Sequence, residues 1–340
     1  MIVMEKILQV KDLRIQFNNG KENIQPISGV YFHVNKGETL GIVGESGCGK
    51  SVTSLSVMGL LPQKTSEIVS GEILFNDRDL SRLTEREFRK LRGNEISMIF
   101  QEPMTSLNPV FTIGKQLSEP LRQHKKMSKS KIRETIIEVL KQVGLPRAEQ
   151  IIDEYPHQLS GGMRQRVMIS LALLCQPKLM IADEPTTALD VTIQAQILEL
   201  LKNIKRKNDM SLILITHDLS VVAEMCDRVV VMYAGEVVEE AEVNELFDQP
   251  LHPYTQGLIQ SLPSNNKRKS KLFSIQGQVP KPSEIKEGCV FANRCPFVFG
   301  KCLTETPPSF QKGKHISKCW LQEPEEMEVK RIGESSTVIS

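Results

Sequence analysis

The sequence of 340 residues predicts an α/β fold built on buried strands. Two observations predict it. Short, continuous apolar runs are typical of strands that are covered on both faces. Between these runs lie longer stretches with the apolar spacing of helices. The strand-like runs lie at residues 39–43, 96–100, 179–182, 212–215, 229–233 and 236–239.

The first of these runs, 39–43, leads through a glycine-rich loop into a helical segment at 50–60. The loop, Gly44-Glu45-Ser46-Gly47-Cys48-Gly49-Lys50-Ser51, fits the pattern G-x-x-x-x-G-K-S/T. Its glycines let backbone N–H groups surround phosphates, while Lys50 reaches the terminal phosphates and the Ser51 hydroxyl ligates Mg²⁺. Val52 can contribute its backbone N–H whatever its side chain. The helix start behind the loop also favours an anion, so this segment predicts a nucleotide site.

The run at 179–182 ends in two adjacent carboxylates, Asp183 and Glu184. Such a buried strand delivers acidic groups to a site at its carboxyl end. Because neighbouring side chains on a strand point in opposite directions, the two acids are expected to have different roles. His217, in Thr216-His217-Asp218, follows the next strand-like run, which makes a functional role more plausible than a structural one.

Two further polar segments border helical stretches. Ser160-Gly161-Gly162 precedes a segment with helical spacing at 163–174, so its unpaired N–H groups could bind an anion. The simpler alternative is that Ser160 only caps this helix. Gln101 ends the run at 96–100 and begins a region, 102–155, that is amphipathic and helical, most clearly at 131–143.

Together, segments 44–51, 159–163 and 179–184 resemble the ATPase subunits of ABC transporters. That resemblance implies a RecA-like core, an antiparallel β subdomain and a helical subdomain at about 102–175, all within residues 1–240. It also implies roles for individual residues. Asp183 would hold Mg²⁺ through water and Glu184 would polarise the attacking water, while Gln101 would sense Mg²⁺ and His217 would contact the γ-phosphate.

The same resemblance implies that each active site is shared between two chains. Ser160, Gly161 and Gly162 would contact ATP held by the opposite ATPase subunit, and Ala188-Leu189-Asp190 would link the two sites. Phe17 is the candidate for stacking on adenine, with Tyr31 as a weaker substitute. An aromatic residue at the end of a strand is, however, more often part of a core.

The C-terminal region, 241–322, resembles that of oligopeptide and dipeptide importer ATPases through His252-Pro253-Tyr254 and the segment 255–263 that follows. This implies an ATP-hydrolysing motor subunit of a membrane importer, with nickel or a metallophore as alternative cargo. The implied partners are a second ATPase subunit, which the family precedent favours as a paralogue, two transmembrane permease subunits, and an extracellular or periplasmic substrate-binding protein.

Four of the seven cysteines fall near the C-terminus with the spacing C-x₅-C-x₆-C-x₁₆-C. A reducing compartment disfavours disulfides, and the spacing lacks the C-x₂₋₄-C pairs common in zinc sites. It resembles the pattern assigned to a 4Fe–4S cluster in some dipeptide importer ATPases. Zinc and a metal-free set of small residues remain as alternatives. Cys48, in the glycine-rich loop, is interpreted as a small filler rather than a redox switch. The four clustered residues are Cys289, Cys295, Cys302 and Cys319.

Composition excludes several classes. A formal charge of +2 gives no sign of nucleic-acid binding. No apolar run approaches the ~18 residues that cross a bilayer, and the N-terminus lacks the regions of a signal peptide. We therefore expect a peripheral protein on the cytoplasmic face of the cell membrane. The polar stretch 323–340 is expected to be disordered.

Two other functional classes are less compatible with this sequence. A soluble ABC ATPase of DNA maintenance would need a long coiled-coil insertion between the loop and Ser160, and no sustained heptads occur there. One that acts in translation usually fuses two ATPase units, whereas one set of motifs occurs here. A metal-binding regulatory protein would leave the complete ATPase site unexplained.

Overall fold

The computed structural model describes residues 5–18, 20, 23–101, 106–187, 189–262, 273–285 and 287–324. Its centre is a sheet of eight strands in the order β11-β12-β10-β9-β3-β8-β7-β6. The strands from β9 to β6 are parallel, and the remaining pairs are antiparallel. The strands are β3 (Thr39–Val43), β6 (Ile96–Ile99), β7 (Leu179–Asp183), β8 (Ser211–Thr216), β9 (Arg228–Tyr233), β10 (Glu236–Glu242), β11 (Phe310–Lys312) and β12 (His315–Ser317).

A second sheet, wholly antiparallel, has the order β2-β1-β4-β5. It covers one face of the central sheet, where alternate side chains such as Ile213 and Ile215 enter a shared apolar core. Leu212 and Leu214 of the same strand point into a separate core that includes the helices. Coverage of both faces explains the continuous apolar runs. The strands are β1 (Lys6–Asn18), β2 (Asn23–Asn35), β4 (Ser66–Phe75) and β5 (Arg78–Asp79).

The helices confirm most of the expected segments, with ends shifted by a few residues. The α-helices are α1 (Lys50–Val57), α2 (Glu85–Leu91), α4 (Ile113–His124), α5 (Lys129–Gln142), α6 (Ala148–Ile151), α7 (Gly161–Leu173), α8 (Val191–Asn208), α9 (Leu219–Met225), α10 (Val243–Asp248), α11 (Pro253–Gln260) and α12 (Gly300–Thr304). Short 3₁₀ helices occupy Leu80–Arg82, Pro156–Gln158, Pro282–Glu284, Ala292–Arg294 and Trp320–Gln322. In the part of the chain described, no helix is both long and apolar enough to cross a membrane.

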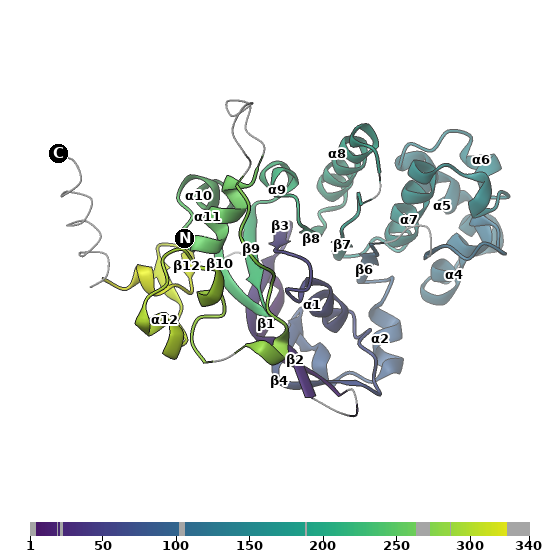
Figure 1. Ribbon diagram of the computed structural model, residues 1–340. Coiled ribbons are helices and arrows are strands. Elements are labelled where there is room, and N and C mark those ends of the chain that lie inside the picture. The colour runs from purple at the N-terminus through teal and green to yellow at the C-terminus, as the bar shows by residue number, and fades with distance from the viewer. Residues whose placement is uncertain are drawn as a thin grey trace.

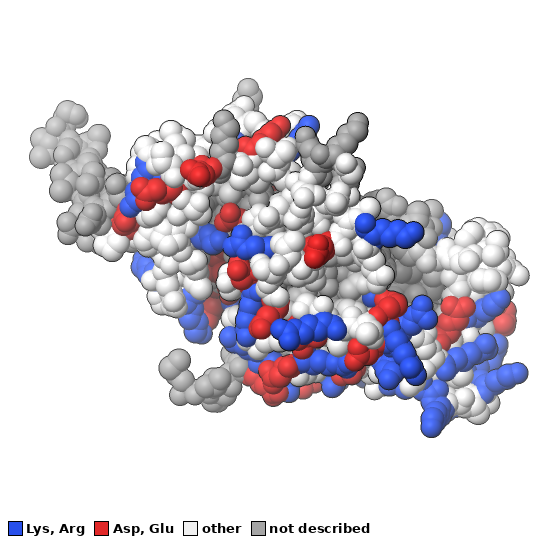
Figure 2. Space-filling view, turned by 90° about the horizontal axis from the view of Figure 1, so that it is seen from below, with Lys and Arg blue, Asp and Glu red and all other residues white. Residues whose placement is uncertain are grey.

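Helices α4 to α7 form a lobe on one side of the central sheet (Figure 1). In α5, the residues Ile132, Ile136 and Leu140 are buried at intervals of four, which is the spacing of one helix face. The lobe is basic, since Lys and Arg outnumber Asp and Glu between residues 113 and 151. Figure 2 shows these cations gathered at the same end of the molecule.

The C-terminal region lies at the opposite end of the sheet (Figure 1) and is more closely joined to it than a separate appendage would be. Its hairpin β11–β12 extends the central sheet, with Ser317 paired to Glu239 of β10. Tyr254 and Phe291 belong to the core that includes α7 and α8. The C-terminal region therefore shares the core of the central sheet, and the separate cluster around Ala292, Cys302 and Trp320 is small. Described residues end at 324, so most of the stretch 323–340 lies outside them.

One buried carboxylate, that of Glu239, fastens this region to β10. It accepts hydrogen bonds from the backbone N–H groups of Leu251 and His252, at 2.6 and 3.1 Å. The His315 ring lies 2.7 Å from the same carboxylate. His252 caps α11 by accepting the Tyr254 N–H at its Nδ1, and Pro253 occupies the first helical position, as expected. Complete burial lowers the pKa of His252 to about 4, and the Glu239 charge only partly opposes this.

Acid should weaken the fold through His252. Its pKa is lower in the folded chain than the value of 6.5 expected when unfolded, so its contribution is complete above pH 6.5 and is lost as pH falls toward 4. The loss is at most about 1.4 kcal/mol per pH unit. Denaturant titrations over this range should show a shallower pH slope for His252→Asn, which keeps a side-chain acceptor. Burial also lowers the pKa of His33, so some slope should remain.

The exposed His157 provides the control for this measurement. His157→Asn should leave the slope unchanged. An equal slope in the wild-type chain and in His252→Asn would contradict the assignment.

Candidate functional site

The glycine-rich loop joins β3 to α1 and is held in a conformation that requires glycine. Gly44, Gly47 and Gly49 all have positive φ angles, of 154°, 83° and 103°. A Cβ on Gly44 would lie 2.3 Å from the Met232 carbonyl oxygen, and one on Gly49 would lie 2.5 Å from the side chain of Ile27. Ser46 and Gly47 are exposed at the turn, where a ligand can reach them. The loop is therefore pressed against the sheet on one side and open on the other.

Lys50 is the buried cation of this loop. Its Nζ donates hydrogen bonds to the carbonyl oxygens of Gly44 and Glu45, at 2.6 and 3.0 Å. The ammonium group therefore sits inside the loop, where phosphate oxygens could replace the two carbonyls. Cys48 packs beneath it, fully buried, and burial raises the pKa of its thiol despite the nearby Lys50 charge. A thiol held protonated favours the space-filling interpretation.

The structure brings Ser51 and Asp183 together, as a magnesium site would require. Asp183 ends β7 and is buried, and burial raises the pKa of its carboxyl group against an opposing hydrogen bond from Ser51. A bound cation would reverse that shift. Hydroxyl and carboxylate oxygens suit Mg²⁺, which takes one or two protein ligands in nucleotide sites and completes its shell with phosphate and water. The oxygen donors present therefore fit this ion.

Glu184 is the centre of a second hydrogen-bonded group. Its Oε2 accepts from Nε2 of Gln101 and from Oγ1 of Thr187, both at 2.9 Å, and its Oε1 lies 3.2 Å from Nδ1 of His217. Partial burial alone would raise the pKa of Glu184. The hydrogen bonds outweigh burial, and the pKa lies below its ordinary value. Glu184 itself has a φ of 47°, a strained conformation for a non-glycine residue.

Thr187 is a contact that sequence analysis missed. It lies three residues after Glu184 and bonds to the same carboxylate oxygen as Gln101. Threonine is too common in loops for this position alone to predict the contact.

Ser160, Gly161 and Gly162 lie on a different element from the glycine-rich loop. Ser160 caps α7 by accepting the Met163 N–H, and both Ser160 and Gly161 are exposed. A Cβ on Gly162 would lie 3.2 Å from Ile193 of α8. Asp190 caps that helix by accepting the Ile193 N–H at 2.9 Å. The starts of α7 and α8 are thus side by side and open to solvent, while Ala188 lies outside the described residues.

The two candidate aromatic residues differ in their surroundings. Phe17 is half-buried near the end of β1 and packs against the core beneath the antiparallel sheet. Tyr31, on β2, is 53% exposed. Both lie on the antiparallel sheet, and neither arrangement by itself identifies an adenine-stacking residue.

Residues of the C-terminal region also reach the glycine-rich loop, which the sequence did not predict. The Tyr254 hydroxyl accepts the backbone N–H of Glu45 at 2.9 Å. The Arg294 guanidinium donates to both carboxylate oxygens of Glu45, at 3.0 and 3.1 Å. A distance of 249 residues in sequence separates Arg294 from Glu45, so no local pattern could have indicated this pair.

The four C-terminal cysteines share one region but do not form a ligand set. Burial raises the pKa of Cys319 to about 12, and the charges of the other three thiolates add to the shift. The Cys289 N–H donates to the Cys302 carbonyl at 2.8 Å, and Cys302 packs in a small core with Trp320. Within the described ranges, however, no three His, Cys, Asp or Glu side chains are grouped to hold a metal ion. As placed, the thiols do not fit a metal centre.

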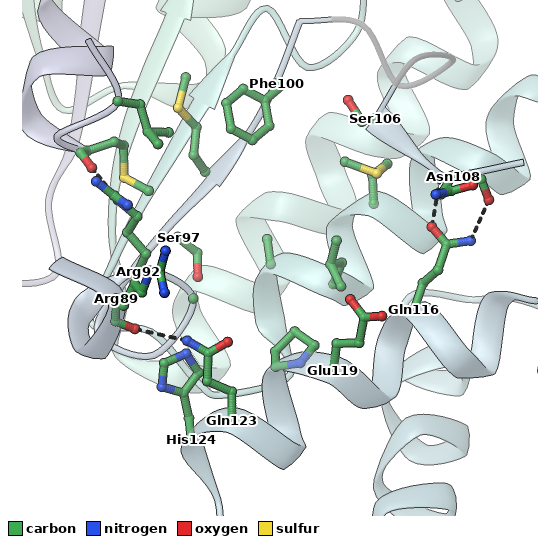
Figure 3. A pocket seen from close by; sticks show the side chains of 18 of the residues that line it. Arg89, Arg92, Ser97, Phe100, Ser106, Asn108, Gln116, Glu119, Gln123 and His124 are labelled. Carbon is green, nitrogen blue, oxygen red and sulfur yellow. Dashed lines mark hydrogen bonds between the residues drawn. The ribbon is translucent and has the colours of Figure 1, made fainter. Parts of the chain in front are cut away.

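A cavity lies away from the glycine-rich loop, between β6 and the lobe of α4 to α7. Its volume is about 870 Å³. Phe100, the residue before Gln101, lines it and is partly exposed. In Figure 3, Arg89 and Arg92 lie opposite a wall formed by α4, and both walls carry charged groups. The α4 side chains labelled there are Gln116, Glu119, Gln123 and His124.

Comparison with known proteins places this arrangement in a family. The family model described as "ABC transporter" matches residues 27–187, and the model described as "Oligopeptide/dipeptide transporter, C-terminal region" matches 238–302. The oligopeptide transport ATP-binding protein AppD of Bacillus subtilis is 55% identical, with 95% of this chain and 98% of that protein covered. This chain belongs to the ATP-binding proteins of oligopeptide and dipeptide ABC transporters.

Other relatives of this ABC ATPase support the same family assignment. The dipeptide transport ATP-binding protein DppD of Bacillus subtilis is 51% identical, over 94% of this chain and 96% of that protein. Among solved structures, the ATP-binding cassette MJ0796, a dimer bound to ADP and phosphate, aligns with a TM-score of 0.62 and 30% identity. That alignment covers 69% of this chain and 98% of the cassette, so part of this ABC ATPase lies outside the shared cassette.

Proposed function

We propose that this chain is the ATP-hydrolysing motor subunit of a membrane importer, with dipeptides and oligopeptides as the cargo. The observation that carries the proposal is the convergence of Lys50, Asp183, Glu184 and His217 at the carboxyl ends of parallel strands. A phosphate-binding loop, an oxygen-ligand pair and a water-orienting carboxylate are the parts that nucleotide hydrolysis requires. The names of the relatives supply the class of cargo.

Binding begins with the glycine-rich loop. The triphosphate displaces the Gly44 and Glu45 carbonyls from Lys50, so that the ammonium group moves from the loop to the terminal phosphates. Ser51 and Gln101 would hold Mg²⁺ through their side-chain oxygens, and Asp183 would hold it through water. Mg²⁺ held there would supply positive charge to neutralise the phosphate oxygens. Val52 and the loop residues from Gly44 to Ser51 contribute backbone contacts, and Phe17 stacks on adenine.

Hydrolysis depends on Glu184. Its lowered pKa keeps the carboxylate ionised at neutral pH, so it can accept a hydrogen bond from the attacking water and orient it toward the γ-phosphate. Three side chains already donate to or contact this carboxylate, which leaves about one of its four acceptor positions for the water. We assign His217 to the γ-phosphate, since it lies beside Glu184 on the neighbouring strand end.

The second half of each active site comes from another ATPase subunit. Ser160, Gly161 and Gly162 form a helix start with Ser160 and Gly161 exposed, a favourable anion site on a different element from the glycine-rich loop. Asp190, beside them at the start of α8, would link the two sites. This arrangement requires a dimer, which we propose is formed with a paralogous subunit. We also propose units at 1–240 and 241–322, with the helical subdomain at about 102–175.

The cavity beside α4 is the proposed contact with the two permease subunits. It lies directly beside Phe100, so movement of Gln101 on nucleotide binding would reach it. Its walls combine apolar and charged groups, which suits a short amphipathic helix. The subunit would then sit on the cytoplasmic face of the membrane, and a separate binding protein would deliver the cargo. Co-purification with membrane subunits distinguishes this from a DNA-maintenance or translation ATPase.

Cargo other than peptides has no supporting observation in this chain, because the proposed motor does not touch the substrate. Nickel and metallophores remain alternatives for the same motor, to be separated by identifying what the binding protein captures.

The Glu184→Gln variant tests the hydrolytic assignment. Because the amide cannot activate water as the carboxylate does, ATP turnover in the assembled complex should fall by about 100-fold or more, while ATP binding is preserved. Steady-state phosphate release and equilibrium nucleotide binding measure the two effects. Glu199→Gln on the exposed side of α8 is the matched control and should leave both unchanged. Undiminished turnover in Glu184→Gln would contradict the assignment.

A 4Fe–4S cluster or Zn²⁺ at the four cysteines stays a prediction from their spacing and the family resemblance. Its support is that Cys289, Cys295 and Cys302 all lie close enough to Cys319 for their charges to raise its pKa. Against it, the side chains as placed form no ligand set, and burial raises the pKa of the Cys289 and Cys319 thiols to about 11 and about 12.

Iron, sulfide and zinc analysis of anaerobically purified chain decides between the three alternatives. A cluster predicts about four irons per chain, with broad absorbance in the visible blue, that Cys302→Ser lowers and Cys175→Ser does not. Cys175 is buried outside this region and serves as the matched control. A chain that carries neither metal would favour the metal-free alternative.

A further inference from the structure

The glycine-rich loop is held from outside the ATPase core by an ion pair that crosses to the C-terminal region. Arg294 and Glu45 share two parallel hydrogen bonds, of 3.0 and 3.1 Å. The Arg294 side chain is 6% exposed and that of Glu45 is 31% exposed. A bidentate pair with such limited contact with water is among the stronger polar interactions and fixes geometry as well as charge.

Arg294 is itself held rigidly. Its guanidinium and Nε also donate to the carbonyl oxygens of Gln276 and Gly277, at 2.9 and 3.3 Å, and to the Tyr233 hydroxyl at 3.3 Å. These contacts come from the segment after residue 272 and from the end of β9. These contacts therefore fix the position of the guanidinium independently of Glu45.

Tyr254 forms a second contact with the same loop residue. Its hydroxyl accepts the Glu45 N–H at 2.9 Å, while its ring packs between Tyr233 and Phe291 at centroid distances of 4.7 and 5.4 Å. The ring is fully buried, so the hydroxyl has little freedom to move. Glu239 and His252 fix the start of α11, and thereby the position of Tyr254.

The location of Glu45 makes its charge important. Its backbone carbonyl accepts a hydrogen bond from Lys50, so it lies within the loop that would surround the triphosphate. An unpaired carboxylate there would repel an anionic ligand, by an amount that low solvent exposure increases. Arg294 cancels this charge and Tyr254 fixes the backbone of the same residue.

We propose that Arg294 and Tyr254 are positioning residues through which the C-terminal region sets the nucleotide affinity of the glycine-rich loop. The inference rests on the proposed ATP-binding function of that loop. A change in the C-terminal region that moved Arg294 away would weaken ATP binding without altering Glu184 or His217. The C-terminal region is thus part of the nucleotide site as well as an extension of the sheet.

The test compares ATP affinity and turnover in full-length Arg294→Met, Arg294→Lys and Glu45→Gln/Arg294→Met. Arg294→Met should bind ATP roughly tenfold more weakly, with kcat at saturating ATP little changed. Arg294→Lys, which keeps the charge, should lie between it and the wild-type chain. The double variant should recover much of the affinity, since no unpaired carboxylate remains. Lys314→Met removes the Lys314–Glu242 pair elsewhere in this region and should have no effect.

The outcomes distinguish failure of this inference from failure of the proposed function. A wild-type chain that does not bind ATP would refute the proposed function. Wild-type binding with equal affinity in Arg294→Met would overturn the inference, as would equal weakening in the single and double variants, which indicates general damage to the fold. If Arg294→Met does not fold, Tyr254→Phe provides the same test: a several-fold weaker affinity supports the inference and an unchanged one overturns it.

Discussion

The parallel pairing of β3, β8 and β7 is the constraint on which the site depends. Val43 is paired with Thr216, and Ile215 with Asp183, so the three strands leave the sheet at nearly the same level. The loop that follows each strand therefore begins beside the others. The backbone of Glu184 continues this pairing by donating its N–H to Ile215. The pairing of the strands therefore brings residues more than a hundred positions apart close together, even without bonds between their side chains.

The two sides of this site are stabilised differently. Hydrogen bonds from neighbouring side chains hold the Glu184 carboxylate. These bonds can be exchanged when water or phosphate enters the site. The glycine-rich loop instead is fixed by buried contacts with the sheet and the C-terminal region, and only Lys50 is held by bonds that a ligand can replace. The glycine-rich loop can therefore keep its shape while the hydrogen-bond partners of Glu184 change.

The sequence predicted the features that local pattern determines. The buried runs identified the strands, and the motif at 44–51 identified the loop, because glycine and lysine are required there by geometry and charge. It also indicated the helix that begins at Pro253. It did not predict that β11 and β12 join the central sheet, because strands of three residues carry too little alternation to be recognised.

Long-range polar contacts likewise could not be predicted from the sequence. Arg294 could have faced any acidic residue, and the partnership with Glu45 is decided by the packing of Tyr233, Tyr254 and Phe291. The cysteine spacing is limited in a different way. It correctly places four thiols in one region, but it cannot decide how their side chains are oriented. That orientation depends on tertiary packing, which buries Cys319 and places Cys302 against Trp320.

Hydrogen exchange of the full-length chain, with and without Mg²⁺ and a non-hydrolysable ATP analogue, tests the central claim most directly. The claim is that the phosphates bind where β3, β7 and β8 end. Exchange should slow at residues 44–52 and in the segment that follows Asp183, with little change in α5. Unaltered exchange at 44–52, with protection confined to the cavity beside α4, would contradict it.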